Sequence, residues 1–538
     1  MKNIKYLLLS AILVAFTACS DDDYDYNPAP EPLPELTAGS VDFSKYVAVG
    51  ASFSAGYTDN ALFIKAQENS FPNILSGIFA NVGGGAFTQP LMKDNIGGFV
   101  MGSTVAVAPR LYLDLTGASP APKLLNAVPT TQLTEVLSGP FNNYGIPGAK
   151  SFHLGIPGYG ALNPYFGRMA SSASATVLGD AVAQNATFFT LSEIGGNDVL
   201  AYATSGGTGI YQLGNLNPAT YGSNDITDPN VFAASFSAAV NALTSNGAKG
   251  VVTNVPYITN LAHFTTVPHN PLSPANPAFG PQIPMLNSIF GALNQIFAVI
   301  DPSRVIVFSE TAASAVVIND ESLTNIAPQI AGALNASPTF PAFIAQFGLP
   351  PQAAPLVANL LASTYGQARQ ATAGDLLVLP SSSVIGTVNM ASVAALMAQG
   401  LPQQLAGQFS VEGVTLPLAD KWVLIPSEQA NIKAATDLYN QSIAAIADQK
   451  DLALVDFKGI LQTATETGFS DGDFIFTTKL VSGGLISLDG VHLTSRGYSL
   501  MANEFLKAID AKYGSNFVAA GYKAKPGEYP TNYNPALR

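Results

Sequence analysis

The chain has 538 residues, of which 48% are hydrophobic and only 11% are charged. This composition can fill a large core and excludes a mostly disordered protein. The formal net charge of −13 argues against nucleic-acid binding, which requires a basic surface, and no basic stripe offsets it.

The first 18 residues have the pattern of a bacterial lipoprotein signal peptide. Lys2 and Lys5 precede an apolar run, residues 6–16, that is too short to span a bilayer. The run ends at Phe16-Thr17-Ala18-Cys19, and Cys19 is the only cysteine, which excludes intramolecular disulfides. The ending resembles a lipobox, whose cleavage leaves Cys19 as a lipid-bearing N-terminus, although Phe16 stands where leucine is usual. The alternative is an ordinary secretory signal with an incidental cysteine.

Residues 19–40 are expected to form a flexible, acidic and proline-rich tether. Ser20-Asp21-Asp22-Asp23 follows the cysteine directly and resembles the surface-export signal of Bacteroidetes-type lipoproteins. The resemblance implies a lipid anchor in the bacterial cell envelope, at the outer membrane and exposed on the cell surface. No later apolar run is long and charge-free enough to predict a transmembrane helix.

Four short apolar segments predict buried strands, at residues 46–49, 187–194, 250–256 and 452–457. They are nearly continuously apolar, which is typical of parallel strands covered on both faces. Helical patterns at 431–448 and 495–512 lie between or after them. We therefore expect residues 41–515 to form an α/β domain, a three-layer α/β/α sandwich around a mostly parallel central sheet.

The stretch from about 260 to 425 differs in composition, being rich in Ala, Pro, Leu and Gln. It contains apolar helical patterns at 326–336 and 351–363 and strand-like pieces at 305–308, 376–379 and 422–425. We interpret it as a large insertion between the fourth and fifth core strands, and an independent structural domain is an equal alternative. Its apolar character would suit a lid or an acyl-chain pocket, but burial in a core explains it equally well. The tail, residues 516–538, is expected to be irregular.

A serine and a histidine at opposite ends of the domain are candidates for acyl transfer. Ser52 follows an apolar strand on a small-residue turn, where its hydroxyl can be exposed and its backbone N–H free; the alternative is a helix cap. His492 is the only one of the four histidines with a carboxylate at a useful spacing. Asp489, three residues earlier, could accept the Nδ1–H and leave Nε2 facing the serine.

An asparagine near the end of another predicted strand could supply an oxyanion donor. Leu191 to Ile194 is followed by Gly195-Gly196-Asn197-Asp198, which would place Asn197 at the carboxyl edge of the sheet. Its amide can donate to an oxyanion without a change of charge, although a simple Gly-Asn turn is the alternative.

These segments, in this order, resemble the SGNH/GDSL hydrolase superfamily of esterases and lipases. Ser52 stands in the serine block, Gly195-Gly196-Asn197-Asp198 matches the asparagine block and Asp489-x-x-His492 matches the last block. The glycine block corresponds to residues 143–149, with Gly148 as the amide donor; Gly158, in a nearby echo of the motif, is the alternative. The chain departs from the family at Ala51, where aspartate is usual. We expect this departure to affect the reaction rate more than the type of reaction.

The resemblance implies a flavodoxin-like SGNH fold and a serine esterase or lipase that needs no metal or cofactor. Ser52 would be the nucleophile, His492 the base and Asp489 its orienter; the backbone N–H groups of Ser52 and Gly148 and the side chain of Asn197 would hold the oxyanion. The expected substrates are acyl lipids or other apolar acyl esters. The alternatives are a carbohydrate O-deacetylase of the same fold, acting on an acylated glycan, and a non-catalytic surface lipoprotein that binds glycan or lipid.

Overall fold

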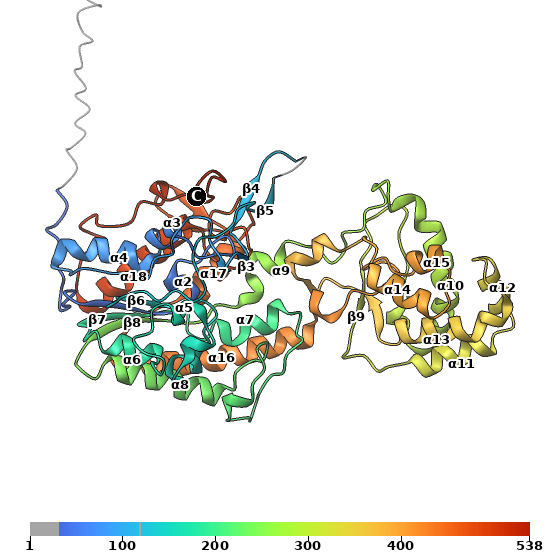
Figure 1. The fold of residues 1–538 in the computed structure, drawn as a ribbon, viewed down its shortest axis with the longest axis horizontal. Helices are drawn as coiled ribbons and strands as arrows, with labels where there is room; N and C mark the ends of the chain where they lie inside the picture. The colour runs from blue at the N-terminus through green and yellow to red at the C-terminus, as the bar shows by residue number, and fades with distance from the viewer. Residues whose placement is uncertain (1–31, 118–119) are drawn as a thin grey trace, which may run out of the picture.

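The computed structural model describes residues 32–117 and 120–538, and the predicted signal peptide and Cys19 lie outside these residues. In the described part the chain builds two lobes that lie side by side along the long axis (Figure 1). The first lobe contains the central sheet, and the second is built from the stretch between the last two strands of that sheet.

The central sheet has five strands, all parallel, in the order β13-β8-β7-β1-β6. Their bounds are β1 (Tyr46–Gly50), β6 (Asn143–Gly145), β7 (Phe188–Leu191), β8 (Lys249–Thr253) and β13 (Ala453–Val455). Nearly every strand residue is buried, because helices cover both faces. The α/β class and the parallel sheet are confirmed, and four of the five strands lie where the apolar segments predict them. The fifth, β6, is only three residues long and has no such signal.

Helices lie on both faces of the sheet (Figure 1). One face is covered by α4 (Phe71–Phe79) and α18 (Ser495–Tyr513), which pack against each other. The other face is covered by α6 (Val177–Val182), α8 (Pro229–Leu243) and α16 (Pro426–Gln449). The apolar residues of these helices and of the strands form one continuous core.

The strand order defines where a ligand is expected to bind. Numbered along the chain, the five strands lie in the order 2-1-3-4-5 across the sheet, so the direction of winding reverses between β1 and β7. In open α/β sheets, ligands bind outside the carboxyl ends of the strands at such a reversal. Ser52 begins α2 (Ser52–Ala55) just after β1, and Asn197 begins α7 (Asn197–Thr204) shortly after β7. Both predicted residues therefore lie at the reversal.

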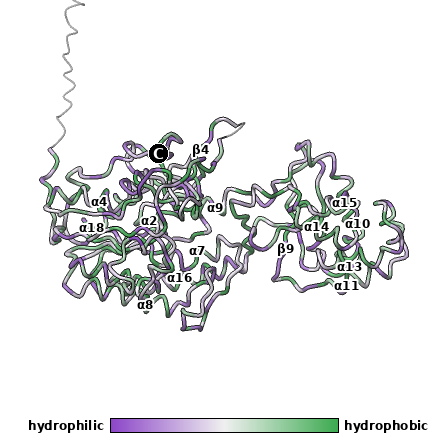
Figure 2. Tube along the Cα trace, in the orientation of Figure 1, coloured by the Kyte–Doolittle hydropathy of each residue, from purple (hydrophilic) through white to green (hydrophobic). Residues whose placement is uncertain are grey.

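The second lobe has its own hydrophobic core, formed by buried residues between Val267 and Ile425. Hydrophobic stretches occur in both lobes (Figure 2). Its helices are α10 (Ile283–Ile300), α11 (Ala327–Ala336), α12 (Phe340–Ala345), α13 (Ala354–Tyr365), α14 (Met390–Ala398) and α15 (Gln403–Gln408). Two small antiparallel pairs complete it, β9 (Val317–Asn319) with β10 (Ala368–Gln370) and β11 (Leu376–Leu377) with β12 (Val423–Leu424).

One predicted strand of the second lobe does not form. Residues 305–308 are extended but pair with no strand. Instead, the segment is bonded by two asparagines of α10. The side-chain amide of Asn294 accepts the backbone N–H of Ile306 and donates to its carbonyl. Asn287 does the same for Phe308. Side-chain amides therefore take the place of a neighbouring strand.

Helix α10 is also the one helix among the described residues that is long and apolar enough to cross a membrane. One side of it lies in the core of the second lobe, where Ile283, Phe290 and Phe297 are buried. Length and composition therefore do not distinguish it from a core helix.

The remaining elements surround the first lobe. They are α3 (Ile64–Glu68), α5 (Pro164–Gly167), α17 (Phe457–Glu466) and three hairpins, β2 (Phe99–Met101) with β3 (Thr104–Val107), β4 (Leu111–Asp114) with β5 (Ala121–Leu124), and β14 (Phe469–Asp471) with β15 (Phe474–Phe476). The tail after α18 is irregular, as predicted, but it is packed: Tyr533 is buried against Phe63. At the other end of the chain, Ser40 donates a backbone N–H to Tyr513, the last residue of α18.

Candidate active site

Ser52 lies at the N-terminus of α2, at the point where β1 ends. It is largely buried, and its backbone N–H has no acceptor among the described residues because it is the first residue of the helix. A first-turn N–H that is left free can donate to an anion that forms on the serine side of the turn. The free N–H that the small-residue turn predicts is therefore present, whereas the serine is buried and not exposed.

The carboxyl group of Glu193 holds this turn from the neighbouring strand. Its Oε1 accepts the backbone N–H groups of Ala51 at 2.6 Å and of Ser54 at 2.8 Å. Ala51 is the N-cap of α2 and offers no side-chain acceptor. Gly50 has to be glycine, because a Cβ there would come within 2.8 Å of the Glu193 carboxyl oxygen. Burial raises the pKa of Glu193 to about 7, although the hydrogen bonds that its carboxyl group accepts lower the pKa.

His492 and Asp489 form the pair that the sequence predicts. His492 Nδ1 lies 2.8 Å from Asp489 Oδ2. Although burial opposes ionisation, the imidazole of His492 and several hydrogen bonds hold the pKa of Asp489 well below its usual range. A carboxylate can only accept hydrogen bonds, so Nδ1 carries the proton and Nε2 is left as the basic nitrogen.

The loop after α2, to which the sequence analysis gives no role, and Ser487 near Asp489 support this pair. The backbone N–H of Asn60 donates to Asp489 Oδ2 at 2.8 Å, and the hydroxyl of Ser487 donates to Oδ1 at 3.0 Å. The ring of His492 packs between the rings of Phe53 and Tyr57, with centroid distances of 5.9 and 4.5 Å. Because Phe53 immediately follows Ser52, these contacts place the imidazole beside the serine turn.

Asp59 is a second buried carboxyl group in the same loop. One of its oxygens accepts the backbone N–H of Leu488, and the other has no hydrogen-bond partner among the described residues. Burial raises its pKa to about 7. Asp59 lies under the loop that carries Asp489 and does not belong to the Asp489–His492 pair.

Asn197 is bonded to the segment that contains Gly148. Asn197 Nδ2 donates to the carbonyl of Ala149 at 2.9 Å, which ties the asparagine to the residue after Gly148. The backbone N–H of Gly148 has no acceptor among the described residues, whereas that of Gly158 donates to Ala175 at 3.0 Å. Gly148 therefore has a free donor in this neighbourhood, and the alternative, Gly158, does not.

A cavity of about 100 Å³ lies against Ser52 and Asn197. Its other lining residues are apolar or glycine except for Glu193 and Glu504. The apolar side chains come from α17, α18, the segments around residues 255–261 and 485–493, and from Phe53 and Leu200. No residue between 262 and 425 lines it, so the apolar residues of the second lobe fill that lobe's own core instead.

The segment that leads from the sheet into the second lobe touches the loop that carries Asp489. The backbone N–H of His263, in α9 (Ala262–Thr265), donates to the carbonyl of Gly490 at 2.9 Å. The His263 ring is buried, neither of its nitrogens has a partner among the described residues, and burial lowers its pKa. Figure 1 shows α9 between the sheet and the second lobe.

The Gly-x-Ser-x-Gly pattern at residues 468–472 forms no nucleophile turn. Ser470 lies on the hairpin of β14 and β15, and Asp471 is buried in contact with Lys523 and Asn503. A strand-to-helix turn is required for that motif to expose its serine, and this segment has none.

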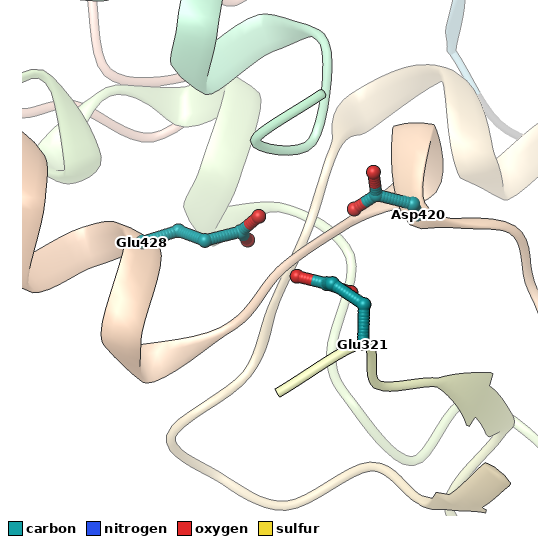
Figure 3. A group of neighbouring side chains, drawn as sticks. All are labelled: Glu321, Asp420 and Glu428. Atoms are coloured by element: carbon teal, nitrogen blue, oxygen red, sulfur yellow. The ribbon is translucent and has the colours of Figure 1, made fainter. Parts of the chain in front are cut away.

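A group of three carboxylates lies where the lobes join, and its members are Glu321, Asp420 and Glu428 (Figure 3). One oxygen of each lies within 4.8 Å of the others. Burial, followed by the charge of Glu321, raises the pKa of Asp420 to about 6. Burial, together with the charges of Glu321 and Asp420, raises the pKa of Glu428 to about 9. Three acidic groups together are not in themselves a metal site, and we assign no ligand to them.

No protein-family model, curated protein or solved structure matches this chain. The site therefore has to be judged on its own geometry. Sequence reasoning missed Glu193, Asn60 and Ser487, which hold Ser52 and Asp489 in place. Glu193 lies in the segment that contains Asn197, but nothing in that segment indicates that it holds the Ser52 turn.

Proposed function

We propose that the chain is a serine-dependent carboxylic ester hydrolase of the SGNH/GDSL type. The observation that carries the proposal is the convergence of three segments at the reversal between β1 and β7. Ser52 has a free N–H, Asn197 lines the same cavity, and the Asp489–His492 pair packs against the turn. These are the parts of an acyl-transfer site.

The chemistry follows from the geometry of these groups. Ser52 Oγ attacks the ester carbonyl while Nε2 of His492 takes its proton, and Asp489 stabilises the imidazolium. The N–H groups of Ser52 and Gly148 and the amide of Asn197 donate to the oxyanion. His492 then protonates the leaving alcohol, and water hydrolyses the acyl-serine in a second round of the same steps.

The fold supports the same assignment. Strand order 2-1-3-4-5 is that of the flavodoxin-like sheet, with its ligand site at the reversal. Helices on both faces fit the three-layer sandwich that the resemblance implies. Cys19 and the acidic residues after it support a lipid-anchored protein of the cell envelope that reaches an acyl lipid or another apolar ester.

The test uses mature, unlipidated protein starting at Ser20, treated with a fluorophosphonate probe and assayed with p-nitrophenyl esters. We expect Ser52→Ala to abolish labelling and to lower kcat by at least about 10³-fold. Ser470→Ala is the matched control, because this exposed serine lies in the misleading motif, and it should leave both signals unchanged. A folded wild type with neither labelling nor turnover would contradict the proposal and favour a binding protein.

A further inference from the structure

The cavity beside Ser52 is separate from the place where an ester's alcohol must leave. Ser52 and Asn197 line it, whereas the imidazole of His492, which would protonate the alcohol, does not. The residues on either side of His492, Val491 and Leu493, do line it. The two halves of an ester attached at Ser52 would therefore lie in different surroundings, with the acyl half on the cavity side.

The lining suits a hydrocarbon chain. Apart from Ser52 and Asn197, the polar exceptions are Glu193, which holds the serine turn, and Glu504, whose carboxylate pairs with Lys507. Leu461 of α17 and Leu500 and Met501 of α18 are buried apolar residues that face the cavity. Buried apolar surface of this kind gains free energy for each methylene group that replaces water or empty space.

The volume limits the length of the chain. An enclosed cavity of roughly 150 Å³ lined by Leu, Ile and Phe holds one benzene molecule. The cavity beside Ser52 has about 100 Å³. By the same measure it holds about four carbons, so an acyl chain of about four to six carbons, counted from its carbonyl carbon, fills it. That is more than an acetyl group and much less than a membrane-lipid acyl chain.

We infer that this cavity binds the acyl chain of the substrate and selects unbranched chains of about four to six carbons. The inference rests on the proposed function and narrows it. It separates the protein from an O-deacetylase, whose acetyl group would leave the cavity unfilled. It also separates the protein from a lipase that prefers long-chain lipids, because the carbons beyond the cavity would gain no further burial there.

The test is a chain-length profile with p-nitrophenyl esters from acetate to laurate. Each methylene buried up to the limit should raise kcat/KM by about fourfold, so that butyrate and hexanoate exceed acetate by at least about tenfold. Beyond octanoate kcat/KM should fall. Ile460→Trp fills the cavity from α17, where Ile460 is only partly buried and a larger side chain can be accommodated.

We expect Ile460→Trp to lower the hexanoate-to-acetate ratio of kcat/KM by at least about tenfold. Ile475→Trp, the same change at an exposed position of β15, should leave the ratio unchanged. Leu461→Ala, which enlarges the cavity, should move the optimum to longer chains and serves if the tryptophan variant does not fold. A labelled, active wild type with a flat profile or a preference for acetate would overturn the inference alone. A protein that is not labelled and hydrolyses no ester would overturn the proposed function as well.

Discussion

Glu193 accepts the backbone N–H of Ser54 at 2.8 Å, the bond that an N-cap side chain at position 51 would otherwise make. Ala51 has no side-chain acceptor, and the carboxyl group reaches the same N–H from the end of β7. Where the SGNH pattern usually has aspartate, Ala51 thus leaves the first turn of α2 to a carboxyl group from the end of another strand.

We predict that Glu193 and residue 51 are exchangeable as caps of the Ser52 turn. Glu193→Ala should lower kcat about 10-fold or more and reduce stability by about 1–2 kcal/mol, the usual cost of a lost cap. Glu193→Gln keeps an acceptor oxygen and should retain most of the activity. Ala51→Asp alone brings two carboxyl groups together and should also be impaired.

The double variant Ala51→Asp/Glu193→Ala decides the matter. It should be more active than Glu193→Ala alone and more active than Ala51→Asp alone, because one carboxyl group again caps the helix. Initial rates and the fluorophosphonate labelling rate of all four proteins form a double-mutant cycle. Strictly additive effects would mean that Glu193 does not replace the missing cap.

We predict that Asn197 acts on the transition state more than on substrate binding. Asn197→Asp keeps the shape of the side chain but removes its N–H donors, so kcat should fall by about 10²-fold with a smaller change in KM. Steady-state kinetics with p-nitrophenyl butyrate measure both constants. Asn241→Ala on the exposed side of α8 is the control. A full kcat in Asn197→Asp would remove the asparagine from the oxyanion site.

We predict that a single methyl group at Gly490 uncouples the Asp489–His492 pair. A Cβ at Gly490 would lie 2.9 Å from the backbone nitrogen of His263 and 3.0 Å from a methyl group of Leu379, and φ at Gly490 is +78°. Gly490→Ala should therefore displace the loop and lower kcat/KM by at least about tenfold.

Gly514→Ala separates this effect from backbone strain. Gly514 also has a positive φ, +73°, but a Cβ there meets nothing within 4 Å. It should cost about 1–2 kcal/mol in thermal unfolding and leave the kinetics unchanged. Equal losses of activity in both alanine variants would point to general destabilisation.

We predict that Glu428 destabilises the protein at alkaline pH. Its pKa is raised to about 9, mainly by burial, so the folded state binds this proton more tightly than the unfolded state does. The loss of folding free energy is absent below pH 4.5, the ordinary pKa of a glutamate in the unfolded chain. It grows as the pH rises and is complete above about pH 9. Glu428→Gln keeps an acceptor for the N–H of Ile425 and should stabilise the protein by at least about 1 kcal/mol at pH 9.

Thermal unfolding in buffer with a chelator, at pH 4.5 and pH 9, measures the effect. The variant and the wild type should unfold at the same temperature at pH 4.5. Glu528→Gln, at an exposed position, should show no difference at either pH. A Glu428→Gln protein that is no more stable than the wild type at pH 9 would show that the carboxyl group is not penalised there.

The parts of the fold that could be predicted are those whose signal is local. Fully buried parallel strands are apolar without interruption, and α18 has a continuous helical pattern, so both are visible in the sequence. Strand β6 is three residues long and is defined by its partner β1, and residues 305–308 depend on asparagines of a distant helix. Those interactions arise only on folding.

The same division applies to the candidate site. Ser52, Asn197, Asp489 and His492 belong to short motifs whose residue types reveal their chemistry. Glu193 and Asn60 are visible only once β1, β7 and the last loop meet, because each acts on a residue more than 100 positions away. The sequence motifs therefore predict the side chains that react. The side chains that position them can be identified only from tertiary contacts.

The contact between Ser40 and Tyr513 determines from which edge of the sheet the predicted tether leaves the domain. It fixes the start of the domain at the amino edge of the sheet, opposite the edge that carries Ser52. With a lipid on Cys19, the 21 following residues reach at most about 70 Å. A lipid anchor would then hold the domain from the edge opposite Ser52 and leave the reactive edge free to meet esters that arrive from the surroundings.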